Sequence, residues 1–364
     1  MSGGFTSSPA SRELPLKGKP VTGGEQCLPL EGKVAAKGGR MRWKSPSTLA
    51  VLLGALLLCA ALFSLCAGAS GLSLAQAILE NGAARRILVH IRLPRTVAAI
   101  LSGAALACSG AIIQGVLGNP LAGPNIIGVN AGAGFMTLLV SWLFPMSAGL
   151  LPAASFAGAF LTSLLILVLV QKTNASRLTV VLAGVAVSAI LSAGTDLITT
   201  IEPEVTLGLT AFRIGGFSGV SANRVYGAAW YILPGLTAAI GMARRLDVLC
   251  LGDETAQSVG LKVKSTRTVL LLLASLLAGA AVSFSGLVGF VGLMSPHMVR
   301  RIAGGEHKQL LPLSMLTGSV MMLLCDTIAR TAFAPYELPV GILLSLIGGP
   351  FFLLMLVKGG RAHD

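Results

Sequence analysis

The chain has 364 residues, of which 54% are hydrophobic and 11% are charged. Soluble domains carry about 25% charged residues, so this composition, with its mean hydropathy of +0.82, excludes an ordinary water-soluble enzyme. The formal net charge of +13 is compatible with nucleic-acid binding, but the basic residues gather in short segments between apolar runs. That distribution is typical of a multi-pass membrane protein, and we expect no nucleic-acid partner.

The first segment, residues 1–45, is rich in Gly, Pro, Ser and Lys and lacks apolar periodicity. It predicts a disordered tail. The apolar run that follows, residues 49–66, ends in "CAGAS", which is similar to a signal-peptidase site. Because the polar leader is long and the apolar run is extended, we favour an uncleaved membrane span over a cleaved signal peptide.

A long stretch free of Asp, Glu, Lys and Arg runs from residue 96 to residue 171. A helical span needs about 20 apolar residues, so this stretch must hold several spans. Pro, Gly and Asn divide it at Gly115–Asn125 and Phe144–Pro152. Together with the later apolar runs this predicts an all-α polytopic protein with about ten transmembrane helices. The predicted spans are 49–66, 96–117, 126–144, 151–170, 178–199, 225–243, 268–284, 286–301, 310–332 and 338–357.

The charge distribution predicts the orientation of these spans. Most of the 27 lysines and arginines fall on one side if the N-terminal tail is placed in the cytoplasm. The positive-inside rule then predicts that both termini are cytoplasmic. Seven arginines remain on the outer side, against the trend: Arg85, Arg86, Arg92, Arg95, Arg213, Arg224 and Arg330.

Motifs for chemistry are missing from the sequence. It contains no G-x-x-x-x-G-K-[ST], no H-E-x-x-H and no G-x-S-x-G, so we expect neither nucleotide binding by a P-loop nor a hydrolytic site. The six cysteines are scattered without a C-x-x-C, and we expect neither a disulfide framework nor a metal site. The chain is therefore predicted to be no enzyme and to hold no cofactor of its own.

The longest internal polar segment is residues 244–267. Within it, "GDETAQSVG" predicts about two helical turns, with Asp253 and Glu254 at the positive end of the helix dipole and Gly260 at its end. Two interpretations remain open from the residues alone. The segment is either a plain connector with a short helix or a docking helix for another subunit.

Ionisable residues also stand near the ends of the last spans. Asp326 and Arg330 are four residues apart, which allows a simple pair on one helical face, while Glu337 follows in the next loop. Such residues in membrane segments are costly and usually paired or functional, so both interpretations stay open. His297, after Pro296, is expected to be a packed residue rather than a ligand.

Arg92 and Arg95 flank Pro94 at the start of the long uncharged stretch. Three residues apart on a helix, they would share a face, and proline is tolerated in the first turn. A planar guanidinium suits bidentate pairing with a carboxylate, which favours a role in receiving a partner. Anchoring of the span at lipid headgroups is the alternative.

Four long motifs together resemble the FecCD family, the permease subunits of ABC importers for iron–siderophore complexes, haem and cobalamin. They are "RLPRTVAAILSGAALACSGAIIQGVLGNPLAGPNIIGVNAGAG", "LGDETAQSVGL", "GLVGFVGLMSPHMVR" and "ELPVGILLSLIGGPFF", in order between about residues 50 and 358. Two departures are visible: Gly123 stands where the family usually has an acidic residue, and "EHK" (Glu306 to Lys308) replaces the family's "DHR".

The resemblance implies a type II ABC importer permease fold over residues 46–364, with a cytoplasmic coupling loop at 244–267. It implies that Arg92, Arg95 and Arg330 dock a solute-binding protein. It also implies that four residues of the coupling loop seat against an ATPase subunit: Gly252, Glu254, Ala256 and Gly260.

The resemblance further implies a set of partners in a bacterial plasma or inner membrane. These are two ABC ATPase subunits that hold ATP and Mg, a periplasmic or lipid-anchored binding protein, and a second permease subunit in a homodimer or heterodimer. The expected cargo is an iron–siderophore or related metal chelate, with haem and cobalamin as alternatives. An ion-coupled secondary transporter is the competing class, but Asp196 and Asp326, the acids inside candidate spans, both lie toward outer ends.

Overall fold

The computed structural model describes residues 46–67, 82–172, 177–333 and 336–360, which form helices joined by short loops. The predicted tail, residues 1–45, lies outside the described residues. The helices begin with α1 (Pro46–Cys66), α3 (Ala83–Ile87), a π-helical segment η1 (Leu88–Arg92) and α4 (Leu93–Leu117). The remaining elements are η2 (Pro124–Ile127), α5 (Val129–Leu143), η3 (Ala148–Leu150), α6 (Leu151–Lys172), α7 (Arg177–Ile201), α8 (Pro203–Ile214), α9 (Ala222–Gly241), α10 (Ala243–Cys250), α11 (Asp253–Ser258), α12 (Val263–Ser285), α13 (Val291–Ala303), α14 (His307–Thr331) and α15 (Val340–Gly360).

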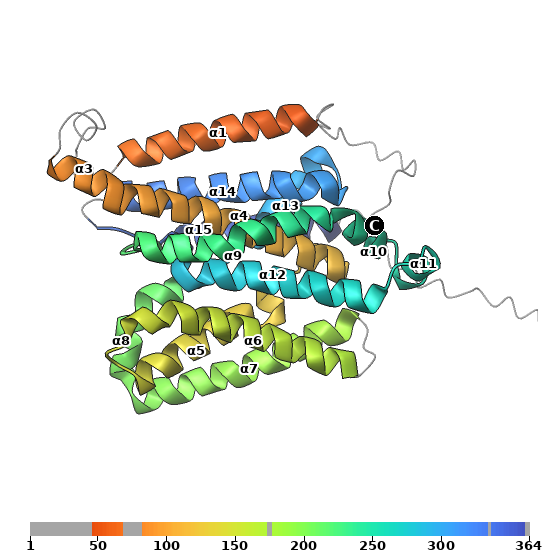
Figure 1. Ribbon diagram of the computed structural model, residues 1–364, viewed down its shortest axis with the longest axis horizontal. Helices are drawn as coiled ribbons and strands as arrows, with labels where there is room; N and C mark the ends of the chain where they lie inside the picture. The colour runs from red at the N-terminus through yellow and green to blue at the C-terminus, as the bar shows by residue number, and fades with distance from the viewer. Residues whose placement is uncertain (1–45, 68–81, 173–176, 334–335, 361–364) are drawn as a thin grey trace, which may run out of the picture.

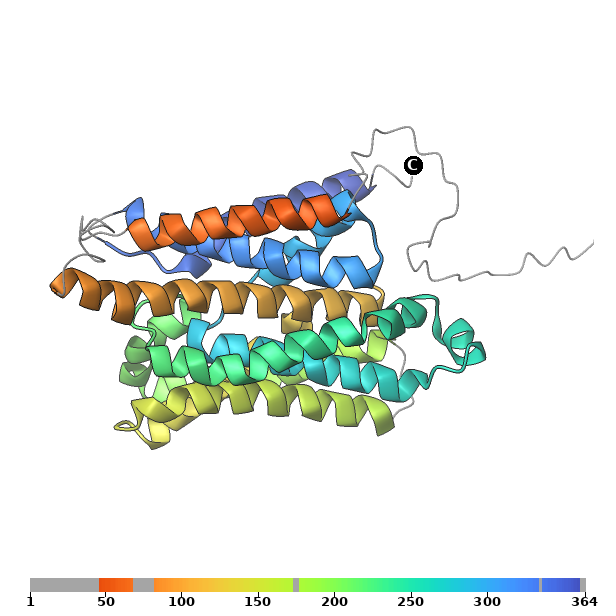
Figure 2. The same cartoon turned by 45° about the horizontal axis from the view of Figure 1, so that its top comes forward.

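The long helices run side by side and give the bundle two distinct ends (Figure 1). We call one the α8 end, where α3 and α8 lie and α1 finishes. We call the other the α11 end, where α10 and α11 lie and α1 begins. Figure 2 shows the same arrangement after rotation, with α11 projecting beyond the neighbouring helices.

Helix α4 is the centre of the bundle. It is buried at almost every position from Ala98 onward, and it packs against α12, α13 and α14. Small residues make this possible, because they let helix backbones approach closely in a membrane protein. Gly110 of α4 meets Gly292 of α13 so closely that a Cβ on Gly110 would lie 2.6 Å from the Cα of Gly292.

The outer faces of the peripheral helices are apolar. Val51 of α1 is 72% exposed, Ile190 of α7 70% and Trp230 of α9 81%. Large exposed apolar surfaces are not stable in water, and they fit a surface that meets lipid or another subunit. Six described helices are long and apolar enough to cross a membrane, or seven if the bent pair α9 and α10 counts as one span.

Each of the predicted spans falls on a described helix, but their number stays a prediction because several of these helices are short. The least regular one is the predicted span 286–301. The structure breaks the chain there: α12 ends at Ser285, and α13 begins at Val291 after Phe290, a non-glycine residue with φ of +66°. Three of the described helices, α3, α8 and α10, were not predicted.

Candidate functional sites

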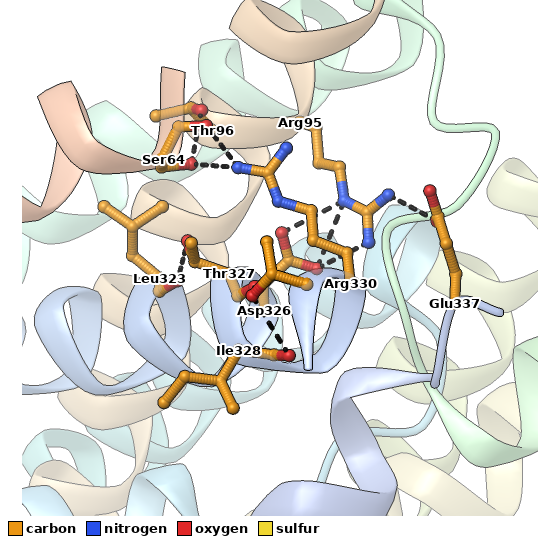
Figure 3. Close-up of polar contacts among 10 residues, drawn as sticks. Ser64, Arg95, Thr96, Leu323, Asp326, Thr327, Ile328, Arg330 and Glu337 are labelled. Carbon is orange, nitrogen blue, oxygen red and sulfur yellow. Dashed lines mark hydrogen bonds and ion pairs between the residues drawn. The ribbon is translucent and has the colours of Figure 1, made fainter. Parts of the chain in front are cut away.

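Two polar sites stand out at opposite ends of the bundle, and the first is an ionic cluster at the α8 end. Arg95, near the start of α4, donates from Nε to Asp326 Oδ2 at 3.0 Å and from a terminal nitrogen to Asp326 Oδ1 at 3.0 Å. Its other terminal nitrogen donates to Glu337 Oε2 at 2.7 Å. Figure 3 shows the guanidinium of Arg95 held between the two carboxylates, one from α14 and one from the loop before α15.

Arg330 and Arg92 fasten the end of α1 to this cluster. Arg330 donates to the backbone oxygen of Ser64 and, at 2.9 Å, to its hydroxyl, which also lies 2.9 Å from the hydroxyl of Thr96 (Figure 3). Arg92 donates to the backbone oxygens of Leu65 at 2.8 Å and Cys66 at 3.2 Å. These carbonyls end a helix and have no partner within it, so the arginines satisfy them.

The three arginines are buried rather than displayed. Arg92 is 6% exposed, Arg95 7% and Arg330 4%. The structure therefore places the three arginines together, as their assignment to one site requires. Each of them, however, is hydrogen-bonded to groups within this chain. Their docking role stays a prediction. Glu337, whose side chain is 40% exposed, is the accessible member of the cluster.

Asp326 has a different partner from the one its spacing suggests. The sequence allows a pair with Arg330 one turn later, but the carboxylate of Asp326 is bound by Arg95, from another helix. Arg330 turns toward α1 instead. A separation of 231 residues leaves no periodic signal, so the sequence could not reveal this pair.

The second site is the α10–α11 segment at the α11 end. The predicted short helix exists as α11, Asp253–Ser258, and Asp253 at its start is paired with Arg267 of α12 at 2.7 Å. Gly252 and Gly260 flank it with φ of +103° and +86°, a backbone region that glycine enters without strain. These two glycines therefore let the chain turn out of the bundle and back.

The faces of α11 differ in exposure. Ala256 is fully buried, and its carbonyl accepts the backbone N–H of Leu261 at 3.0 Å. Glu254 is exposed, and Val259 just beyond the helix is 69% exposed. The inner face thus packs against the bundle, while the outer face leaves an acid and an apolar side chain exposed.

Sequence reasoning missed a third polar contact, between α10 and α14. Asp247 Oδ1 lies 2.6 Å from His307 Nδ1 and accepts the backbone N–H of His307 at 2.9 Å. Nearby, Arg300 of α13 donates to the side-chain oxygen of Gln114 of α4. The only sequence signal was an acid in an otherwise basic segment.

A pocket of about 170 Å³ opens among α5, α7 and α8. Its polar lining includes Asn130, Thr195, Asp196 and Arg213. Asp196 and Arg213 are exposed, so the pocket offers both signs of charge to a bound molecule. No group of three or more metal-ligating side chains occurs within the described residues.

Comparison with known proteins identifies the relationship. Residues 56–358 match the sequence profile of the FecCD transport family. The chain belongs to this family. The Fe(3+)-citrate import system permease protein of Bacillus subtilis (strain 168) is 37% identical over 271 residues, 74% of this chain and 81% of the relative. The hemin transport system permease protein of Yersinia pestis is 38% identical over 286 residues, 76% of this chain and 85% of the relative.

A solved structure agrees with the family membership. A chain from an inward-facing conformation of a metal-chelate type ABC transporter superposes on this FecCD family member with a TM-score of 0.77 and 31% identity. The match covers 86% of this chain and all of the other. This confirms the predicted fold of an ABC importer permease. The chain is a multi-pass membrane permease and not itself an enzyme.

Proposed function

We propose that the chain is the membrane subunit of an importer that carries an iron–siderophore or a related metal chelate into the cytoplasm. The observation that supports this most directly is α11: a short helix on two glycines, fixed on its inner face and exposed on its outer face, at one end of a transmembrane bundle. Such a helix suits a partner that binds at the surface of the membrane and exerts force on the helix. ATP and Mg would be held by that partner, an ABC ATPase subunit.

The orientation follows from this assignment. The α11 end faces the cytoplasm, in agreement with the positive-inside rule, and both termini lie there. The α8 end faces outward and receives a periplasmic or lipid-anchored binding protein. The cargo passes between this chain and a second permease subunit, in a homodimer or heterodimer within the plasma or inner membrane.

Docking of the binding protein is proposed to involve Arg92, Arg95 and Arg330. Their burial sets a condition on this role: a partner's carboxylate must reach Arg95 in competition with Glu337, which already occupies one edge of its guanidinium at 2.7 Å. Glu337 is also partly open to solvent, so it can leave the arginine without being drawn through the core. The cluster would then exchange one carboxylate for another.

Metal chelates fit the relatives best, since one relative is named for ferric citrate and the solved structure for a metal chelate. Haem, for which another relative is named, and cobalamin remain the alternative cargoes. The test is binding of ferric hydroxamate, ferric citrate, haem and cobalamin to the cognate binding protein, followed by uptake into vesicles that contain the assembled transporter. Selective uptake of a ferric chelate supports the proposal, and selective uptake of cobalamin contradicts its cargo.

An ion-coupled secondary transporter is the candidate from another class. Such proteins bind coupling ions near the membrane midplane. Asp326 lies near the α8 end and is bound by Arg95, and exposed Asp196 lies late in α7. Neither arrangement places an open carboxylate at the middle of the bundle, so we favour the ATP-driven mechanism.

A further inference from the structure

The contact between α10 and α14 consists of two hydrogen bonds to one carboxylate oxygen. A carboxylate only accepts hydrogen bonds, so His307 donates to Asp247 Oδ1 from both its ring Nδ1, at 2.6 Å, and its backbone nitrogen, at 2.9 Å. His307 is 4% exposed, and the side chain of Asp247 is 19% exposed. One oxygen atom therefore ties the two helices together in a largely buried place.

The backbone bond gives Asp247 a second task. His307 is the first residue of α14, and the residue before it, Glu306, makes no side-chain capping bond. The first N–H groups of a helix have no partner within the helix, and a carboxylate there also favours the positive end of the dipole. Asp247 thus caps α14 from a different helix, and displacement of α10 would disturb the start of α14.

The ring of His307 has little freedom to find another position. Its Nε2 is buried and has no hydrogen-bond partner among the described residues. On this side it meets Gly115 of α4, where an added Cβ would lie 2.8 Å from Nε2 and 2.9 Å from Leu246 of α10. A glycine at this point leaves the space that lets the imidazole and α10 close on each other.

The two helices lead to the two candidate sites. From Asp247, α10 continues through Cys250 directly into the turn that carries α11. From His307, α14 runs for 25 residues, or about 37 Å at 1.5 Å per residue, and carries Asp326 and Arg330 of the arginine cluster near its far end. The contact between Asp247 and His307 therefore lies where the α10–α11 segment meets α14, the helix that reaches the α8 end.

We propose that Asp247 and His307 are positioning residues that transmit movement of the α10–α11 segment to α14, and so connect the ATPase side with the binding-protein side. The inference rests on the proposed function, because it assigns a role within the same importer. If the contact served stability alone, any substitution that removed one buried hydrogen bond between helices would have the same effect.

The test uses the complete transporter, assembled with its ATPase and reconstituted in vesicles. The measured quantity is the ratio of ATP hydrolysis with the cognate binding protein to hydrolysis without it, which needs no knowledge of the cargo. Coupling energies of 1–3 kcal/mol correspond to factors of about 5 to 150, so Asp247→Ala should lower this ratio about fivefold or more. The matched control is Ser109→Ala, which removes a buried 2.7 Å bond from α4 to the Ala274 carbonyl of α12.

A pair of milder variants keeps the test decisive if Asp247→Ala does not fold. In His307→Asn the side-chain amide nitrogen takes the place of Nδ1 and can still donate to Asp247, whereas in His307→Gln it takes the place of Nε2. We expect His307→Asn to keep most of the ratio and His307→Gln to lose it. Equal ratios in these two variants, or equal losses in Asp247→Ala and Ser109→Ala, would overturn the inference. A wild-type ratio of one would instead contradict the proposed function.

Discussion

Gly103 of α4 lies directly against Gly318 of α14, so that a Cβ added to Gly103 would stand 2.7 Å from the carbonyl carbon of Gly318. The obstacle is backbone and cannot rotate away. We expect Gly103→Ala to force the two helices apart and to lower the free energy of unfolding by about 1–3 kcal/mol, the usual cost of overpacking. Thermal unfolding in detergent measures the effect.

The control for this substitution is Gly54→Ala in α1, where an added Cβ meets nothing within 4 Å. It makes the same chemical change in a helix that has room for it. Equal unfolding temperatures for the two variants would show that the close approach of α4 and α14 does not hold the bundle together.

Because Arg95 and Asp326 are paired, we expect their substitutions to have non-additive effects on the stability of the protein. Breaking a buried pair by removing one partner costs about 3–5 kcal/mol, because the other charge is left uncompensated. Asp326→Asn alone should therefore destabilise the protein strongly, while Arg95→Gln combined with Asp326→Asn should recover part of the loss. Unfolding temperatures of the single and double variants form the test, and additive losses would argue against the pairing.

Glu337 is expected to restrain docking of the binding protein. Glu337→Gln removes the charge that competes for Arg95 but keeps a group of the same shape, so the affinity for the binding protein should rise, most clearly at low salt where charge interactions are least screened. Surface titration of the immobilised transporter at two salt concentrations measures this. The matched control is Glu202→Gln, an exposed acid before α8.

A lower affinity in Glu337→Gln would indicate that Glu337 itself contacts the partner. Arg92→Gln provides the complementary variant. Arg92 donates to carbonyls at the end of α1, so its replacement leaves the ion pair between Arg95 and Asp326 intact. We expect it to weaken docking, and unchanged affinity would remove Arg92 from the proposed site.

Glu254 is expected to matter for coupling and not for folding. It is exposed in the first turn of α11, and Glu254→Arg places a positive charge where the helix dipole disfavours one. The yield of complex with the ATPase, or ATP hydrolysis stimulated by the binding protein, should fall while the amount of inserted permease stays the same. Gln257→Arg, on the same short helix, is the control. Wild-type yield and stimulation in Glu254→Arg would show that α11 is a plain connector.

Local features were the ones that the sequence predicted well. The helix α11 was predicted because acids follow Gly252 and a second glycine ends the turn, and both glycines have positive φ in the structure. The apolar runs likewise coincide with helices. The predicted span began at residue 96, where the uncharged stretch begins, whereas α4 begins at Leu93 and buries Arg95.

Contacts between distant residues were out of reach. Arg95 and Asp326 lie 231 residues apart, and Asp247 and His307 lie 60 apart. The periodicity of apolar residues and the composition of a segment indicate which face of a helix is apolar, but they do not indicate which helices pack against each other. A pair of Asp326 with Arg330 was one of the two interpretations left open, because it satisfied the local rule of spacing. The structure instead shows a bidentate contact of Asp326 with Arg95, which depends on tertiary packing.

The central claim is that a separate ATPase drives transport through this chain. It is tested most directly by uptake of a radiolabelled ferric chelate into vesicles that contain the permease and its ATPase, with the loaded binding protein outside and ATP inside. The account predicts uptake that requires ATP, stops with vanadate and continues when ionophores collapse the ion gradients. Uptake by the permease alone that follows an ion gradient, or ATP hydrolysis by the purified chain without its partner, would contradict it.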